Sequence, residues 1–326
     1  MARELVNELT WSVSRDRLFR QCRRAYYYNY YGSWGGWDAA AADERTRRIY
    51  ILKNIQSLNM WAGGIVHDTI AEALRRFAAK TEPVTVEALR QAARSKLRRG
   101  WLEAVNREWL VSPKKTNLFE LYYGNGATVP EELTEDVKTR VYGCLEALAT
   151  SPLLAEIIAA GYMNWKPVDT LDAFVLDDGL KVWCAIDFAF FDEAGMLRIL
   201  DWKTGSEQPE ELKVQLACYA MFAMRKWKAP LQRLRLAGVF LGDTARVSEY
   251  PLSTELLADT ENIIGESIGK MRLPLSEPEK NMAREEDFPT CDVPRICGRC
   301  NFREVCPAIT GSKPKTEAAP ASAHEE

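Results

Sequence analysis

Asp187, Asp201 and Lys203 have the side-chain types and the spacing that could bind a divalent cation. Segment 180–191 is apolar on both faces, which predicts one central strand with Asp187 in its middle, and Asp201 and Lys203 end the next strand, 196–205. Side chains two residues apart on a strand share a face, so Asp201 and Lys203 point the same way. A hairpin between the two strands would bring Asp187 beside them. Two facing carboxylates repel each other, and a shared proton or a divalent cation is the common remedy.

His67 could add an imidazole to this set. The segment 61–80 has the apolar periodicity of a helix, and His67 borders its buried face. A lone histidine there is commonly a hydrogen-bonded core residue, but two aspartates and an imidazole together suit Mg²⁺ or Mn²⁺. The backbone carbonyl of Trp202 could add an oxygen, and Lys203 could hold a substrate phosphate or orient the attacking water. The alternative is that Asp201 and Lys203 are an ordinary salt-bridged strand end.

A helix predicted over 208–228 carries Gln215 and Tyr219 four residues apart, so both lie on one face. An amide and a phenol on a buried helix face are unusual for plain packing. Both can hydrogen-bond a phosphate or a strand of nucleic acid.

The cysteines near the end of the chain have the spacing of metal ligands. Cys297, Cys300 and Cys306 lie within ten residues, and three close thiolates require a fourth ligand. Cys291 is a candidate because it is near in the sequence. Without a secretory signal, eight cysteines indicate reduced thiols or metal ligands more than disulfides. Four-thiolate sets serve both zinc and iron–sulfur clusters.

Cys22 lies within a basic, aromatic segment, 14–31, that predicts one helix. Its tyrosines are expected mainly to pack in the core, although rings beside basic residues can also form a stacking platform for single strands. Five arginines, Arg15, Arg17, Arg20, Arg23 and Arg24, are too many for one solvated face of an otherwise acidic protein and could contact phosphates. Of these, Arg20, Arg23 and Arg24 are the ones that we expect to contact DNA.

The elements that position these residues predict an α/β fold with a mixed central β-sheet flanked by helices. An N-terminal helical region precedes the strands, which begin after Pro167, and one helix lies between later strands. A cysteine-rich segment follows the core. Further helices are expected over 85–110, 131–160 and 252–272.

The composition limits where the chain could bind nucleic acid. The formal net charge is −3, so binding must come from local basic patches. No apolar run is long enough to span a membrane and the N-terminus lacks a signal-peptide core. We therefore expect a cytoplasmic protein without a membrane partner.

The order His67, Asp187, Asp-Trp-Lys at 201–203 and Gln215-x₃-Tyr219 resembles the PD-(D/E)XK nuclease superfamily. The most similar branch is RecB-like and includes CRISPR-associated RecB-like exonucleases and AddB-type nuclease domains. The resemblance implies a restriction-endonuclease-like core, metal ligation by the histidine and both acidic residues, assistance of the attacking water by Lys203, and DNA contact by Gln215 and Tyr219. Asp201 stands where many members have glutamate.

The resemblance also implies an activity. The implied activity is that of a metal-dependent deoxyribonuclease that hydrolyses phosphodiester bonds. The enzyme would act as a single-stranded DNA exonuclease in repair, recombination or CRISPR-type processing, with a helicase or a CRISPR or repair protein as its expected partner. The alternative is a DNA-binding or assembly module with a vestigial or partner-activated site, and a zinc-stabilised scaffold is a third option.

A RecB-like subset with an iron–sulfur cluster carries one cysteine near the N-terminus and three near the C-terminus. The resemblance therefore implies a [4Fe–4S] cluster on Cys22, Cys297, Cys300 and Cys306, with Zn²⁺ on the same thiolates still open. It also implies a single nuclease domain over residues 1–310, and the composition of the remaining residues predicts a disordered tail. Its parts are a helical region at about 81–165, a catalytic core at about 166–275, a cluster segment at 288–309 joined to Cys22, and the tail at 311–326.

Overall fold

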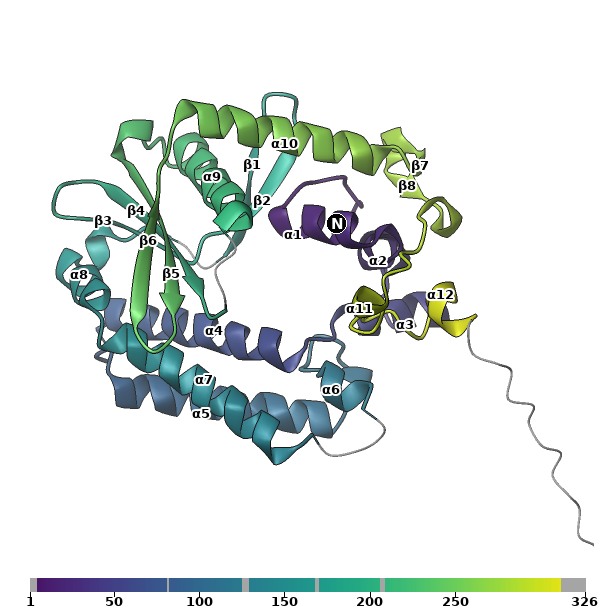
Figure 1. Ribbon diagram of the computed structural model, residues 1–326, viewed down its shortest axis with the longest axis horizontal. Coiled ribbons are helices and arrows are strands. Elements are labelled where there is room, and N and C mark those ends of the chain that lie inside the picture. Colours follow the sequence, from purple (N-terminus) through teal and green to yellow (C-terminus); the bar gives the residue numbers. More distant parts are fainter. Residues whose placement is uncertain (1–4, 81, 125–128, 168–169, 206–208, 312–326) are drawn as a thin grey trace, which may run out of the picture.

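The computed structural model describes residues 5–80, 82–124, 129–167, 170–205 and 209–311 (Figure 1). All but the first residue of the expected disordered tail, 311–326, lies outside the described residues.

The central sheet is mixed, with strand order β3-β4-β5-β6. β3 and β4 pair antiparallel, β4 and β5 parallel, and β5 and β6 antiparallel. A parallel pair needs a crossover, and helix α9 provides it between β4 and β5. The predicted α/β class with a mixed sheet flanked by helices is confirmed. The strands are β3 (Phe188–Phe191), β4 (Leu197–Lys203), β5 (Leu234–Leu241) and β6 (Ala245–Tyr250), and α9 is Pro209–Lys226.

Helices cover both faces of this sheet, with α9 and α10 on one side and α4, α5 and α7 on the other (Figure 1). The side chains of β4 alternate between the two faces of the sheet. Ile199 packs in the core that includes α9. Leu200 and Trp202 pack in the core that includes α4 and α7. The covering helices are α4 (Leu58–Ala78), α5 (Val86–Val105), α7 (Glu131–Ala149) and α10 (Thr254–Arg272).

The prediction of one strand over 180–191 was wrong. β2 (Lys181–Ala185) pairs with β1 (Leu171–Val175) in a separate sheet, and Asp187 lies in the gap before β3. The cause is non-local: the backbone of Trp11 pairs with β2, donating to Lys181 O at 2.9 Å and accepting from Trp183 N at 2.8 Å.

The predicted helix over 14–31 is interrupted at Cys22. α1 (Val13–Gln21) ends there, α2 (Arg23–Tyr27) begins, and a π-helical turn follows at Tyr28–Gly32. Cys22 is extended, and its Sγ caps α2 by accepting from the N–H of Ala25 at 3.5 Å. The helix predicted over 131–160 also divides, because α8 (Pro152–Ala160) starts anew at a proline. Neither α3 (Glu44–Lys53) nor α6 (Phe119–Tyr122) was predicted, and two short helices also lie in the C-terminal segment that was expected to be cysteine-rich loop.

The C-terminal segment packs against the N-terminal helices, so the two ends of the described chain lie side by side (Figure 1). Arg24 donates from Nε to Phe288 O at 2.7 Å and from Nη1 to Glu285 at 2.9 Å. Tyr28 donates to Glu285 at 2.7 Å. The segment contains β7 (Leu275–Glu277), β8 (Met282–Ala283), α11 (Pro294–Cys297) and α12 (Pro307–Thr310).

Within the described part of the chain, no single helix has the length and apolar composition to cross a membrane. The pair α7 and α8 meets those two criteria only jointly and is bent by 56°.

Candidate active site

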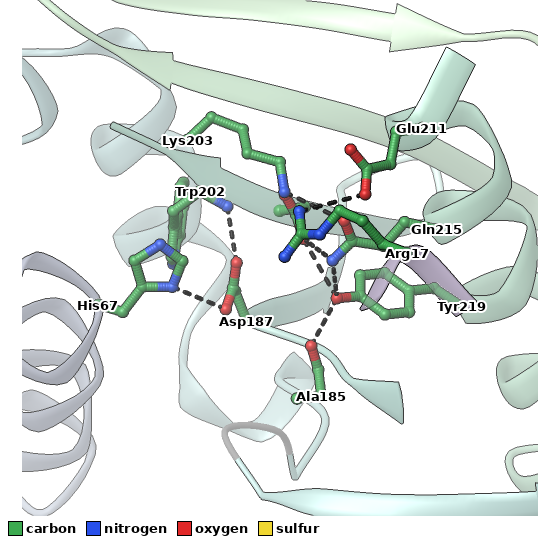
Figure 2. Close-up of polar contacts among 10 residues, drawn as sticks. Arg17, His67, Ala185, Asp187, Trp202, Lys203, Glu211, Gln215 and Tyr219 are labelled. Carbon is green, nitrogen blue, oxygen red and sulfur yellow. Dashed lines mark hydrogen bonds and ion pairs between the residues drawn. The ribbon is translucent and has the colours of Figure 1, made fainter. Parts of the chain in front are cut away.

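Asp187 holds two neighbours at the edge of the central sheet (Figure 2). It precedes β3, whose first residue, Phe188, pairs with Leu200 of β4. One carboxylate oxygen lies 3.0 Å from Nδ1 of His67, on α4. The other accepts the backbone N–H of Trp202 at 2.8 Å. A donor from the neighbouring strand and an imidazole from a covering helix thus fix the orientation of this carboxylate.

Asp201 is almost completely buried in β4, at 1% exposure. Its Oδ2 pairs with Nζ of Lys203 at 2.6 Å. Its Oδ1 accepts from Nε2 of Gln215 at 2.9 Å and lies 3.1 Å from the hydroxyl of Tyr219. That hydroxyl also accepts from Gln215 at 2.7 Å and donates to Ala185 O at 2.6 Å. Helix α9 therefore reaches the carboxylate through the two residues that the sequence placed on one of its faces.

The charges in this site shift several pKa values. Burial, together with the charge of Asp187, raises the pKa of Asp201 to about 6, although Lys203 opposes the shift. Burial lowers the pKa of His67, but the charges of Asp187 and Asp201 outweigh it and the net shift is upward. Burial raises the pKa of the Tyr219 phenol well above its ordinary value. Two carboxylates so close together are therefore balanced by a lysine and an imidazole.

The donor atoms fit a divalent cation in type. The Oδ2 atom of Asp201 is buried without a hydrogen bond, and its contact is the ion pair with Lys203. Carboxylate oxygens and one imidazole nitrogen suit Mg²⁺ or Mn²⁺. The carbonyl of Trp202, the fourth predicted ligand, belongs to β4 between Asp201 and Lys203. Among the described residues, however, no three His, Cys, Asp or Glu side chains are arranged as a finished metal site.

One cavity of about 860 Å³ is lined by six of the predicted residues: His67, Asp187, Asp201, Lys203, Gln215 and Tyr219. Trp202, which was predicted to supply a backbone carbonyl, is not among the described residues that line it. The same cavity is lined by Arg15, Arg17 and Tyr30, which belong to the segment whose arginines and tyrosines the sequence analysis gave as possible contacts for a single strand. It is also lined by Trp34 and Lys53, which the sequence analysis did not assign to a site. A signal was present for α3, the helix that ends with Lys53, because Asp43 caps it by accepting from Thr46 N at 2.9 Å, and a capping aspartate marks a helix start.

The three arginines predicted to contact DNA do not line this cavity. Arg20 pairs with Asp16 at 2.7 Å, and the guanidinium of Arg23 lies 5.4 Å from the ring centroid of Phe19. Both line a second cavity, of about 1020 Å³. Arg24 is buried, and its guanidinium donates hydrogen bonds to Glu285 and Phe288 within the protein.

Five cysteines from both ends of the chain line a third, small cavity. They are Cys22, Cys291, Cys297, Cys300 and Cys306. The structure thus brings the four predicted thiols together, and Cys291 lies with them, its Sγ 3.8 Å from that of Cys297. Burial raises the pKa of Cys22, and it raises that of Cys300 to about 12, so both thiols are protonated at neutral pH.

Comparison with known proteins places the chain in a family. No curated protein matches it. Among solved structures, the crystal structure of SSO0001 is 19% identical, with a TM-score of 0.27 and coverage of 65% of this chain and 81% of that chain. A family model described as the PD-(D/E)XK nuclease superfamily matches residues 10–307. This range includes the predicted site residues that line the cavity, from His67 to Tyr219. The chain belongs to the PD-(D/E)XK nuclease superfamily.

Proposed function

We propose that this chain is a metal-dependent deoxyribonuclease that hydrolyses phosphodiester bonds as an exonuclease on single-stranded DNA. Membership of the superfamily supports the general activity, because its members are in general nucleases that use Mg²⁺ or Mn²⁺. The observation that carries the proposal is the convergence of Asp187, Asp201 and Lys203 in one cavity.

His67, Asp187, Asp201 and the carbonyl of Trp202 are the groups that would hold the cation. When bound, it would stabilise the negative charge that develops on the phosphate. Lys203 is partly exposed and has an acceptor in Gln215 as well as in Asp201, at 3.1 Å and 2.6 Å. It can therefore turn toward a water or a phosphate oxygen, and the cation would then neutralise the buried Asp201 carboxylate that Lys203 leaves. Its role is to orient the water that attacks phosphorus while the bond to the leaving oxygen breaks.

A single-stranded substrate is supported by the composition of the cavity. Aromatic and cationic side chains line it beside the catalytic residues. Bases without a partner strand can stack on such rings, whereas paired bases are already stacked within a duplex. The resemblance to the RecB-like branch supports action from an end, and a helicase or a CRISPR or repair protein is the partner class that it suggests.

We also propose a structural metal centre on Cys22, Cys297, Cys300 and Cys306, with a [4Fe–4S] cluster preferred over Zn²⁺. These four thiols line one cavity, which supports the proposal. Cys22 lies near one end of the chain and the other three lie near the other end, so a metal or cluster bound to all four would link the two ends. The nuclease and this centre would then form one domain over residues 1–310.

The test uses 5′- and 3′-end-labelled DNA with Mn²⁺ or Mg²⁺ and a matched circular single strand. The proposal expects mononucleotides or short products from linear single strands, released from one end, and an intact circle. Cleavage of the circle would overturn exonuclease action, and preference for a duplex or for RNA would overturn the substrate.

The alternative, a DNA-binding module whose site needs a partner, has one observation in its favour. Lys203 and His67 lie against the carboxylates that would bind the cation. DNA binding without cleavage by the wild-type chain under all metal conditions would favour this alternative.

A further inference from the structure

Two cationic groups in the cavity that holds the two aspartates have no carboxylate partner among the described residues. Arg15 and Lys53 both line it, and neither is used by the proposed chemistry. Other cations of the same cavity are paired: Arg17 with Glu211 at 3.1 Å, and Lys203 with Asp201. Arg15 and Lys53 therefore lack the counter-charge that the other cations of this cavity have among the described residues.

Arg15 is a buried charge with neutral partners only. It is 4% exposed, and its Nε and Nη1 donate to Tyr26 Oη at 3.1 Å and Thr10 Oγ1 at 2.9 Å. Its Nη2 atom is buried without a hydrogen-bond partner. The guanidinium lies 4.2 Å from the ring centroid of Tyr30. Burying an unpaired guanidinium is costly, so the arrangement is expected to gain from an incoming anion.

Lys53 approaches the same ring. It ends α3, and its Nζ lies 5.8 Å from the Tyr30 centroid. Among the residues that the structure describes, it has no carboxylate partner. Burial, with the nearby charges of Lys114 and Arg15, lowers the pKa of Lys53 to about 8. A tyrosine ring thus has two cations beside it, both without a counter-charge.

Trp34 offers an accessible ring at the same cavity. It is 39% exposed and stands edge-on to Trp37, with ring centroids 5.0 Å apart. Rings beside cations are what proteins use to bind unpaired bases and their phosphates.

We propose that Arg15 and Lys53 bind a phosphate that neighbours the cleaved one, while Trp34 and Tyr30 stack on bases of the unpaired strand. This subsite rests on the proposed nuclease function and adds the means by which a single strand is chosen and aligned. Arg15 and Lys53 supply the charge for the backbone, and the rings exclude a duplex because its bases are not free to stack.

The test is binding of a fluorescent single-stranded oligonucleotide, followed by anisotropy, in a Lys203→Ala background that keeps the DNA intact. Lys53→Gln is expected to weaken binding by about tenfold and to reduce the slope of log affinity against log salt by about 0.7. Lys53→Arg keeps the charge and is expected to restore most of the affinity. Trp34→Ala is expected to weaken binding by about tenfold or more without changing the salt slope. Lys280→Gln is the matched control, since Lys280 pairs with Glu277 at 2.6 Å away from both large cavities.

The outcomes separate this subsite from the nuclease activity. Unchanged single-strand affinity in both Lys53→Gln and Trp34→Ala overturns the subsite, even where the wild-type chain cleaves DNA well. Selective loss of single-strand binding in those variants supports it, even where the wild-type chain cleaves nothing. Trp34 is exposed, so its variant keeps the test valid should the change at Lys53 disturb folding.

Discussion

The side-chain amide of Gln215 joins Asp201 to Lys203. Its Nε2 donates to Asp201 Oδ1 at 2.9 Å, while its Oε1 accepts from Lys203 Nζ at 3.1 Å. The resemblance to the superfamily implied that Gln215 and Tyr219 contact DNA. In the structure their polar atoms are hydrogen-bonded to protein groups, so we regard both as positioning residues.

Gln215→Ala is therefore expected to lower kcat rather than DNA affinity. A hydrogen bond to a charged group contributes about 1.5–3 kcal/mol, which corresponds to a loss of about tenfold to a hundredfold in rate. Single-turnover cleavage gives the rate, and anisotropy gives the affinity. Gln91→Ala, an exposed glutamine on α5, is the matched control. A rise in Kd at unchanged kcat would show that Gln215 contacts DNA instead.

The affinity for Mn²⁺ is expected to fall at acid pH. The pKa of Asp201 is raised to about 6, so below that pH a cation has to displace a proton from the carboxylate. Protonated His67, whose pKa is also raised, acts in the same direction. We expect a loss of about tenfold in affinity per pH unit below about pH 6, and little change above pH 7.

Calorimetric titration of Mn²⁺ between pH 5 and 8 measures this dependence. In Lys203→Met the fall should begin at higher pH, because Lys203 lowers the pKa of Asp201. An affinity that is constant over the whole range would contradict the assignment of Asp201 as a ligand.

Glu285 connects the two ends of the chain. It accepts from Arg24 at 2.9 Å, Tyr28 at 2.7 Å and Arg45 at 2.8 Å. Glu285→Gln leaves the buried Arg24 without its counter-charge and is expected to lower the free energy of unfolding by about 2 kcal/mol at pH 7. Denaturant unfolding measures the change, and Glu279→Gln is an exposed control.

This effect should depend on pH. Burial raises the pKa of Glu285, but the hydrogen bonds from Tyr28 and Arg45 outweigh it, and the net shift is downward. A depressed carboxyl pKa stabilises the fold above the unfolded value of about 4.3, and this contribution is lost as the pH falls through the folded value. A difference between wild type and Glu285→Gln that stays constant down to pH 3 would contradict this linkage.

Removal of one predicted cysteine ligand should release the metal. We expect wild type prepared without oxygen to contain iron and absorb in the visible region, and Cys22→Ser to lose both. Cys144→Ser is the control, since that thiol donates to Leu241 O within the core. Iron and zinc content, measured with the spectrum, distinguish the two metals.

Cys291 makes this experiment selective. It lines the same cavity, but the predicted set excludes it. Cys291→Ser should therefore retain the metal. Loss of metal in Cys291→Ser with retention in Cys22→Ser would identify Cys291 as the fourth ligand, and a wild-type chain free of iron and zinc would contradict the centre altogether.

The sequence predicted those parts of the site that depend on local periodicity. Strand alternation put Asp201 and Lys203 on one face, and the hairpin through β3 and β4 brought Asp187 to them, as the structure has it. Helical spacing likewise put Gln215 and Tyr219 together.

The remaining features depend on contacts between distant segments. β2 pairs with the backbone of Trp11 and ends at Ala185, before β3 begins at Phe188, and no pattern within 180–191 records that pairing. Arg24 is buried by its contacts with Glu285 and Phe288, which lie 261 and 264 residues later in the chain. Lys53 reaches the cavity only through packing of α3, so its role could not be read from its neighbours in sequence.

The most direct test of the central claim compares wild type with Asp201→Asn. Asparagine preserves the shape of the buried side chain and removes its charge. With Mn²⁺ and labelled single-stranded DNA under single-turnover conditions, we expect the wild-type chain to cleave and Asp201→Asn to lose at least about a thousandfold in rate while still binding the DNA. Equal cleavage by both proteins would show that the metal-dependent chemistry does not take place at this pair of carboxylates.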